Sequence, residues 1–200
     1  MQSSVNTLGS VYVASVTAGS KVVQLLACTF DAMGTTMAVY GGQNYGAMKL
    51  ERIHKGVGAC VLLAAIYSAA AFVFTWFCGK DIASFFIDST EPAETRTTIA
   101  NFARSFLVGN VAFFMPLALV NILRFMIQGL GFTKQAVIAG VLEMIARGVE
   151  GLMLVPKLGY DVVCFANPMA WIMADLFLVS IYFRDVGQLK KQYTLNPQKS

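Results

Sequence analysis

Long apolar stretches, separated by short charged segments, dominate the hydropathy pattern of this chain of 200 residues. A membrane-spanning helix needs about 20 mainly apolar residues, because the hydrocarbon core of a bilayer is roughly 30 Å thick. Five stretches come close to this length or exceed it, at residues 11–41, 56–79, 103–127, 135–155 and 165–184. The pattern therefore predicts an all-α, polytopic membrane protein with five transmembrane helices in the lipid bilayer.

Composition agrees with lipid surroundings. Apolar residues make up 56% of the chain and charged residues 13%, whereas about a quarter of the residues in soluble domains are charged. Five successive apolar helices with so few charged residues between them could not form the polar surface that a soluble protein needs. A water-soluble enzyme of ordinary surface is therefore excluded.

The few reactive side chains exclude further classes. The four cysteines form no CxxC pair, and His54 is the single histidine, so we expect no metal site. We read His54 as a solvated residue of a basic loop, and no cluster near it resembles a catalytic site. No basic cluster is interleaved with aromatic residues, so we expect no nucleic-acid partner. The chain is not expected to be an enzyme or to hold a cofactor.

Lysine and arginine are distributed unequally between the two sides of the predicted bundle. Five spans place the loop at 42–55 and the C-terminal tail on the same side, and that side collects nine Lys and Arg residues, including Arg124, against four on the other. Loops rich in Lys and Arg stay in the cytoplasm. We therefore expect the C-terminus to be cytoplasmic.

Polar side chains of the first predicted helix recur at steps of three and four, which places them on one face. The members of this stripe are Thr17, Lys21, Gln24, Cys28, Asp31 and Thr35. Lys21 and Asp31 have no oppositely charged neighbour at i±3 or i±4, and they lie about 15 Å apart along the helix axis. Each then needs water or a partner on another helix, which favours a water-filled cavity and transport.

A third charge inside a span is Asp175, near the middle of the last predicted helix. A membrane carboxylate that gains and loses a proton is a candidate coupling group. A salt bridge to Lys21, or to a residue elsewhere, is the structural alternative. We take Lys21, Asp31 and Asp175 as candidates for the substrate or ion pathway.

Other polar residues in the spans favour a structural interpretation. Glu143 and Arg147 stand at i and i+4 and can form an ion pair. Asn110 and Asn121 are expected to bond neighbouring helices as part of a polar network within the lobe. Pro116 removes one helix hydrogen bond, which predicts a bend between Ala112 and Pro116.

After the first predicted helix comes the sequence Gly42-Gln43-Asn44-Tyr45-Gly46-Ala47, which resembles the multidrug and toxic compound extrusion (MATE) family. The motif residues carried over are Gln43, Asn44, Gly46 and Ala47. Three further stretches carry the same resemblance in the same order, at Val5–Gly9, Asn121–Gly131 and Gly140–Arg147.

The resemblance implies twelve helices in two lobes, of which residues 1–200 would form most of the C-terminal lobe, helices eight to twelve. The N-terminal lobe and helix seven would then be missing partners, and the chain would be truncated at its N-terminus. Some sodium-coupled members carry a carboxylate in helix ten, which the span at 105–123 lacks.

By the same resemblance, the expected function is secondary antiport in a bacterial cytoplasmic membrane. Amphipathic, often cationic drugs would leave in exchange for protons or sodium ions, by alternating access between two lobes. The alternatives are a flippase for lipid-linked oligosaccharides from the same superfamily and an inactive lobe fragment. Such flippases tend to have cationic cavities, whereas the candidates here mix Lys21 and Arg147 with several acids.

Overall fold

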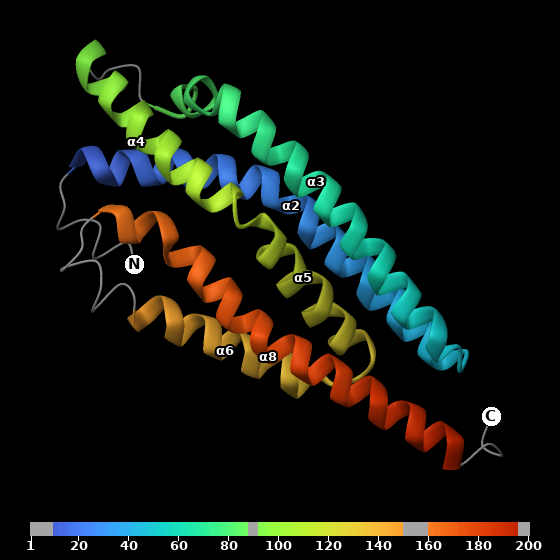
Figure 1. Ribbon diagram of the computed structural model, residues 1–200. Helices are drawn as coiled ribbons and strands as arrows, with labels where there is room; N and C mark the ends of the chain where they lie inside the picture. The colour runs from blue at the N-terminus through green and yellow to red at the C-terminus, as the bar shows by residue number, and fades with distance from the viewer. Residues whose placement is uncertain (1–9, 88–91, 150–159, 196–200) are drawn as a thin grey trace.

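The computed structural model describes residues 10–87, 92–149 and 160–195, and every element in these ranges is an α-helix (Figure 1). The helices are α2 (Ser10–Gly46), α3 (Leu50–Ser84), α4 (Ala93–Val111), α5 (Phe114–Gly129), α6 (Thr133–Val149) and α8 (Tyr160–Leu195). The predicted all-α fold is confirmed. The stretch at Val5–Gly9 lies outside the described residues.

Three helices, α2, α3 and α8, are long and apolar enough to cross a membrane, and α4 with α5 makes a fourth span if the bent pair is counted as one. The predicted span at 135–155 corresponds to α6 up to Val149, and residues 150–155 lie outside the described ranges. With 17 residues, α6 is shorter than the roughly 20 that a bilayer core requires. The polytopic architecture is thus confirmed, but five full spans are not.

The three long helices extend well beyond their predicted boundaries. They contain 37, 35 and 36 residues for α2, α3 and α8, so each is about 50–55 Å long. The prediction of a loop at 42–55 is therefore wrong, because only residues 47–49 separate α2 from α3. A helix can continue into water once its hydrocarbon-facing part ends, so hydropathy marks the span and not the end of the helix.

The motif at Gln43–Ala47 forms this tight connection. The Asn44 amide donates to the carbonyl of Tyr40 at 2.8 Å, and the Asn44 carbonyl accepts the backbone N–H of Lys49 at 2.8 Å. Met48 takes the left-handed conformation, with φ of 57°. These bonds close the end of α2 and turn the chain into α3.

The predicted bend is present between α4 and α5. The two helices meet at Ala112 and Phe113 at an angle of 49°. Pro116 lies in the first turn of α5, where a missing N–H costs little because that group has no partner within the helix. The break thus lies on the N-terminal side of the proline, as its ring geometry requires.

The tightest helix contact joins α2 to α5 through residues without bulk. A Cβ on Gly34 would collide with Phe125, and one on Gly129 would overlap the backbone carbonyl of Ala38. Small residues let membrane helices approach closely and gain dispersion energy. The aromatic core beside this seam is compact, since Phe30 stacks edge-on against Phe114 with ring centroids 5.3 Å apart.

The connections alternate between the two ends of the bundle. In Figure 1 the α2–α3 turn, the α5–α6 turn and the C-terminal end of α8 lie at one end, and the end of α3 and the start of α4 lie at the other. This arrangement puts the basic segments at 49–55 and 184–191 on the same end, as the charge count predicts. The assignment of that end to the cytoplasm stays a prediction.

Candidate functional site

A cleft of about 310 Å³ lies between α2, α4, α5, α6 and α8. Apolar side chains, among them Val23, Leu117 and Trp171, make up part of its wall. Four charged residues also line it, namely Asp31, Arg124, Glu143 and Arg147. Such a mixture of apolar surface and a few converging polar groups is typical of small-molecule sites.

Two arginines share one carboxylate in this cleft. Arg124 on α5 donates from Nη2 to Oε2 of Glu143 at 2.6 Å, and Arg147 donates from Nη2 to Oε1 of the same residue at 2.5 Å. The side chain of Glu143 is 13% exposed, against 22% for Arg124 and 42% for Arg147. The predicted Glu143–Arg147 pair is confirmed, but it belongs to a three-residue cluster that joins α5 to α6.

Arg124 is not among the predicted site residues, because the charge count assigns it to the predicted cytoplasmic side as the end of a span. In the structure Arg124 lies inside α5, one helical turn before its end, and faces the cleft. Helical spacing predicts that Arg124 shares a face with Asn121, three residues before it, and both residues line the cleft. The predicted cytoplasmic side keeps the larger share of Lys and Arg without it.

Asp175 lies on α8 next to this cluster. It is close enough to Arg124 and Glu143 for electrostatic interaction with both. Its Oδ1 atom is buried and has no hydrogen-bond partner within the described part of the chain. The predicted alternative of a bridge to Lys21 is not formed, since neither residue takes part in an ion pair in the described ranges.

The stripe predicted on the first helix is real, because all six of its members are exposed on α2. Asp31 and Gln24 line the cleft, whereas Lys21 is not among the lining residues. The Lys21 ammonium instead lies 6.0 Å from the ring centroid of Phe86. The structure therefore places Asp31, and not Lys21, in the cleft that the charged cluster also lines.

The two asparagines behave differently. Asn110 is fully buried and donates to the carbonyl of Cys164 at 3.3 Å, while its Oδ1 accepts a hydrogen bond from Asn167 at 3.0 Å. It therefore joins α4 to α8, as expected. Asn121 donates to the carbonyl of Leu117 in its own helix at 3.1 Å and lines the cleft. The bond that it makes in the described residues therefore lies within α5, and the predicted bond to a neighbouring helix is not observed there.

The reading of His54 as a solvated loop residue is wrong. His54 is half-buried in the first turns of α3, and its Nδ1 lies 3.0 Å from the hydroxyl of Tyr182 on α8. The two rings meet edge-on at 5.6 Å. No group of three or more potential metal ligands occurs in the residues that the structure places.

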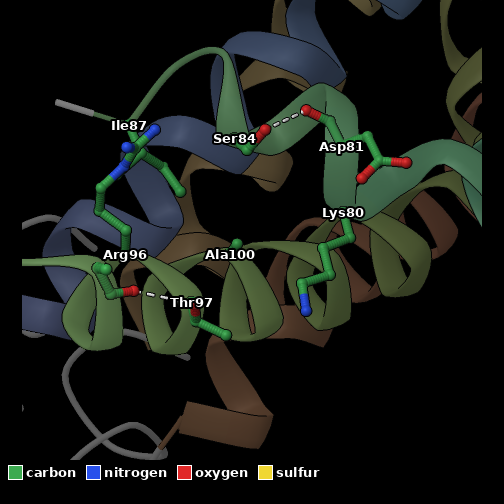
Figure 2. Close-up of a pocket in the computed structure, with 8 residues that line it drawn as sticks. Lys80, Asp81, Ser84, Ile87, Arg96, Thr97 and Ala100 are labelled. Carbon is green, nitrogen blue, oxygen red and sulfur yellow. Dashed lines mark hydrogen bonds between the residues drawn. The ribbon is translucent and has the colours of Figure 1, made fainter. Parts of the chain in front are cut away.

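A second hollow of about 280 Å³ lies between the end of α3 and the start of α4 (Figure 2). Lys80, Asp81 and Arg96 are its charged residues. Figure 2 shows the Lys80 and Arg96 side chains extending away from each other, so the two cations do not converge on one ligand position. This hollow is less suited than the cleft to bind a charged molecule.

Comparison with known proteins gives one family. A family model described as MatE matches residues 1–149. This match covers α2 to α6, which include four of the five helices that line the cleft. No curated protein matches the chain, and no solved structure matches it.

Proposed function

The chain belongs to the MatE family, and from this premise we propose that it supplies one lobe of a secondary antiporter. Members of the family are transporters and not enzymes, and the apolar helices make this a multi-pass membrane protein. The exported molecules would be drugs or other amphipathic organic ions. Protons or sodium ions would enter in exchange, with a second lobe as partner.

The observation that carries this proposal is the charged cleft within a bundle of membrane helices. Charged side chains are costly inside a membrane and are retained where they face water or a pathway. Asp31 and the cluster around Glu143 share one cleft with apolar surface. That combination suits an amphipathic ion, because the aromatic and aliphatic walls bind its body while Asp31 attracts a cationic group.

Coupling would run through the carboxylates. Asp175 interacts with Arg124 and Glu143 but has a buried oxygen without a hydrogen-bond partner in the described residues. Binding of a proton or a sodium ion there would change the charge of the cluster that forms one wall of the cleft. The bend at Ala112 and Phe113 gives α5, which carries Arg124, a point about which to move.

The two alternatives make different demands. A flippase for lipid-linked oligosaccharides would need a cavity with a clear excess of positive charge for pyrophosphate. Here the two arginines of the cleft pair with Glu143, and Asp31 lines the same cleft, which favours the antiporter. An inactive lobe would bind and move nothing.

The test uses inside-out membrane vesicles that hold an acidic lumen, from cells that produce the chain alone or with a first lobe from a MatE protein. We expect a cationic dye to release protons from the lumen only when both lobes are present, and a sodium gradient to replace the proton gradient if sodium is the coupling ion. Absence of ion movement with both lobes, or movement of a fluorescent lipid-linked pyrophosphate in place of the dye, would overturn the proposal.

A further inference from the structure

We propose that a groove on the exposed surface of α3 binds an anionic phospholipid, with an acyl chain along the helix and the phosphate between Lys80 and Arg104. The groove has a volume of about 260 Å³ and is lined by Phe72, Val73, Trp76 and Phe77. Among the described residues, none of α3 lines the cleft, so this inference goes beyond the proposed transport function and does not depend on it.

The groove is apolar and open to the surroundings of the bundle. Phe77 and Trp76 are 76% and 50% exposed, and the ring centroids of Phe72 and Trp76 lie 5.8 Å apart. All four lining residues belong to the uncharged stretch at 56–79, which is a predicted span. Their exposed surface therefore lies at the depth of the hydrocarbon core, where a lipid chain contacts it.

Arg104 brings a positive charge to the end of this groove. Its Nη2 donates to the backbone carbonyl of Trp76 at 3.0 Å, and its Cζ lies 5.6 Å from the centroid of the Trp76 ring. A Cβ on Gly79 would lie 3.7 Å from the Cγ of Arg104, so the stem of Arg104 lies against α3 at a residue without a side chain. The charge is thus fixed beside the groove while the aliphatic stem is covered.

Lys80 supplies a second positive charge at the same depth. It lies one helical turn beyond Trp76 and directly after the predicted span, and Arg104 is the second residue of the predicted span at 103–127. Figure 2 shows the Lys80 side chain extending toward α4, the helix that carries Arg104. Both charges therefore lie where the hydrocarbon core meets the headgroups, a boundary at which tryptophan is also enriched.

The neighbouring charges leave this position suited to an anion. Figure 2 shows the Lys80 and Asp81 side chains leaving α3 in different directions, and Arg96 extending away from Lys80, so neither Asp81 nor Arg96 is assigned to the site. Arg104 lies 11 residues, about 17 Å, along α4 from the first residue of that helix. Its position therefore depends on Trp76 and not on the segment that precedes α4.

These features match the two parts of a phospholipid. Arginine binds phosphate through short, charge-assisted hydrogen bonds, often two at once, and basic residues at the membrane surface attract anionic lipids. The groove adds apolar contact that a free phosphate could not use. Phosphatidylcholine has the same chains but no net negative charge, so its comparison with phosphatidylglycerol isolates the contribution of the headgroup.

The experiment uses Trp76 as the fluorescent reporter. Trp171→Phe leaves Trp76 as the only tryptophan of the full chain, which is placed in phosphatidylcholine nanodiscs. Part of the lipid is replaced by phosphatidylglycerol or phosphatidylcholine with brominated acyl chains, because bromine quenches tryptophan fluorescence on contact. We expect phosphatidylglycerol to bind about tenfold or more tightly than phosphatidylcholine, since each basic residue near a membrane surface contributes about fivefold.

Four variants assign the preference to residues. Lys80→Gln and Arg104→Gln are each expected to lower the ratio of the two association constants by about fivefold, and Arg104→Lys, which keeps the charge, to lower it less. Arg52→Gln removes an equivalent charge at the opposite end of α3 and is expected to leave the ratio unchanged. Inorganic phosphate should not displace phosphatidylglycerol, because it lacks the chain that occupies the groove.

The proposal is overturned if both brominated lipids quench Trp76 equally, because the groove would then hold ordinary bilayer lipid. It also fails if neither lipid quenches, which would place another protein surface, such as a second copy, over the groove, or if inorganic phosphate displaces phosphatidylglycerol. A preference that survives both Lys80→Gln and Arg104→Gln would contradict the headgroup position. None of these outcomes bears on antiport, which is measured by ion movement.

Discussion

Arg124 on α5 donates a hydrogen bond of 2.6 Å to Glu143 on α6. These residues lie 19 positions apart, and the bond ties the two helices across a turn of three residues. Arg147 completes the cluster from the same side of α6. One carboxylate thus compensates the charge of two arginines in a membrane protein, and its removal should lower the stability of the fold.

Glu143→Gln is expected to lower the free energy of unfolding by about 3 kcal/mol, because it removes the carboxylate with which both arginines pair. Arg147→Gln should cost less than about 1 kcal/mol, because that side chain is 42% exposed. Thermal unfolding in detergent micelles measures both. Equal losses for the two variants would show that Glu143 is not the centre of the cluster.

Gly129→Ala should weaken the contact between α2 and α5. The added methyl group would overlap the carbonyl of Ala38, and overpacking of this kind typically costs about 2 kcal/mol. Gly140→Ala is the matched control, because a Cβ there meets nothing within 4 Å, and it should stabilise α6 by up to about 1 kcal/mol. If the Gly129→Ala variant has an unchanged free energy of unfolding, α2 and α5 can move apart at little cost.

Pro116→Ala restores a backbone N–H in the first turn of α5 and should favour a straight junction with α4. Straightening the angle of 49° would lengthen the distance between spin labels at Thr97 and Lys134 by about 4 Å. Pulsed electron resonance on a cysteine-free background measures this distance. An unchanged distribution would assign the bend to packing around Phe113 and not to the proline.

Asp175→Asn is expected to abolish proton or sodium movement coupled to dye transport. It should not destabilise the fold, because a neutral amide replaces a carboxylate whose buried oxygen has no hydrogen-bond partner among the residues that the structure describes. Asp31→Asn should weaken dye binding, and Asp81→Asn, outside the cleft, serves as control. Full transport by the Asp31→Asn and Asp175→Asn variants together would remove both residues from the pathway.

The orientation can be tested with cysteines placed at opposite ends of the bundle. Lys49→Cys lies in the α2–α3 turn and Phe85→Cys beyond the end of α3, and both positions are exposed. In intact cells without other cysteines, an impermeant maleimide should label position 85 and not position 49. The opposite pattern would invert the predicted topology.

Much of the fold follows from hydropathy alone. The apolar stretches predict α2, α3 and α8, and Pro116 predicts the bend between α4 and α5. The ends of the helices could not be predicted from hydropathy, because the turns that prolong α2 and α3 are polar and are closed by local hydrogen bonds such as the one from Lys49 to Asn44. For α6, the predicted span at 135–155 is described only as far as Val149, so this fifth span stays a prediction.

The candidate site was predictable only in part. Periodicity places Asp31 on the exposed stripe of α2 and pairs Glu143 with Arg147, because both follow from spacing within one helix. The addition of Arg124 and the exclusion of Lys21 depend on how helices pack against each other. That packing is determined by tertiary contacts such as the one between Gly129 and Ala38, which sequence spacing does not contain.

The seam at Gly129 has a mechanical consequence. Because α5 rests directly on the backbone of α2 at Gly129 and Ala38, movement of α5 about its hinge would move the adjacent part of α2 with it. Asp31 and Arg124 would then move together, and the width of the cleft would depend on how far this part of α2 and α5 shifts relative to α6. The Arg124–Glu143 ion pair connects α5 to α6 and would oppose this shift.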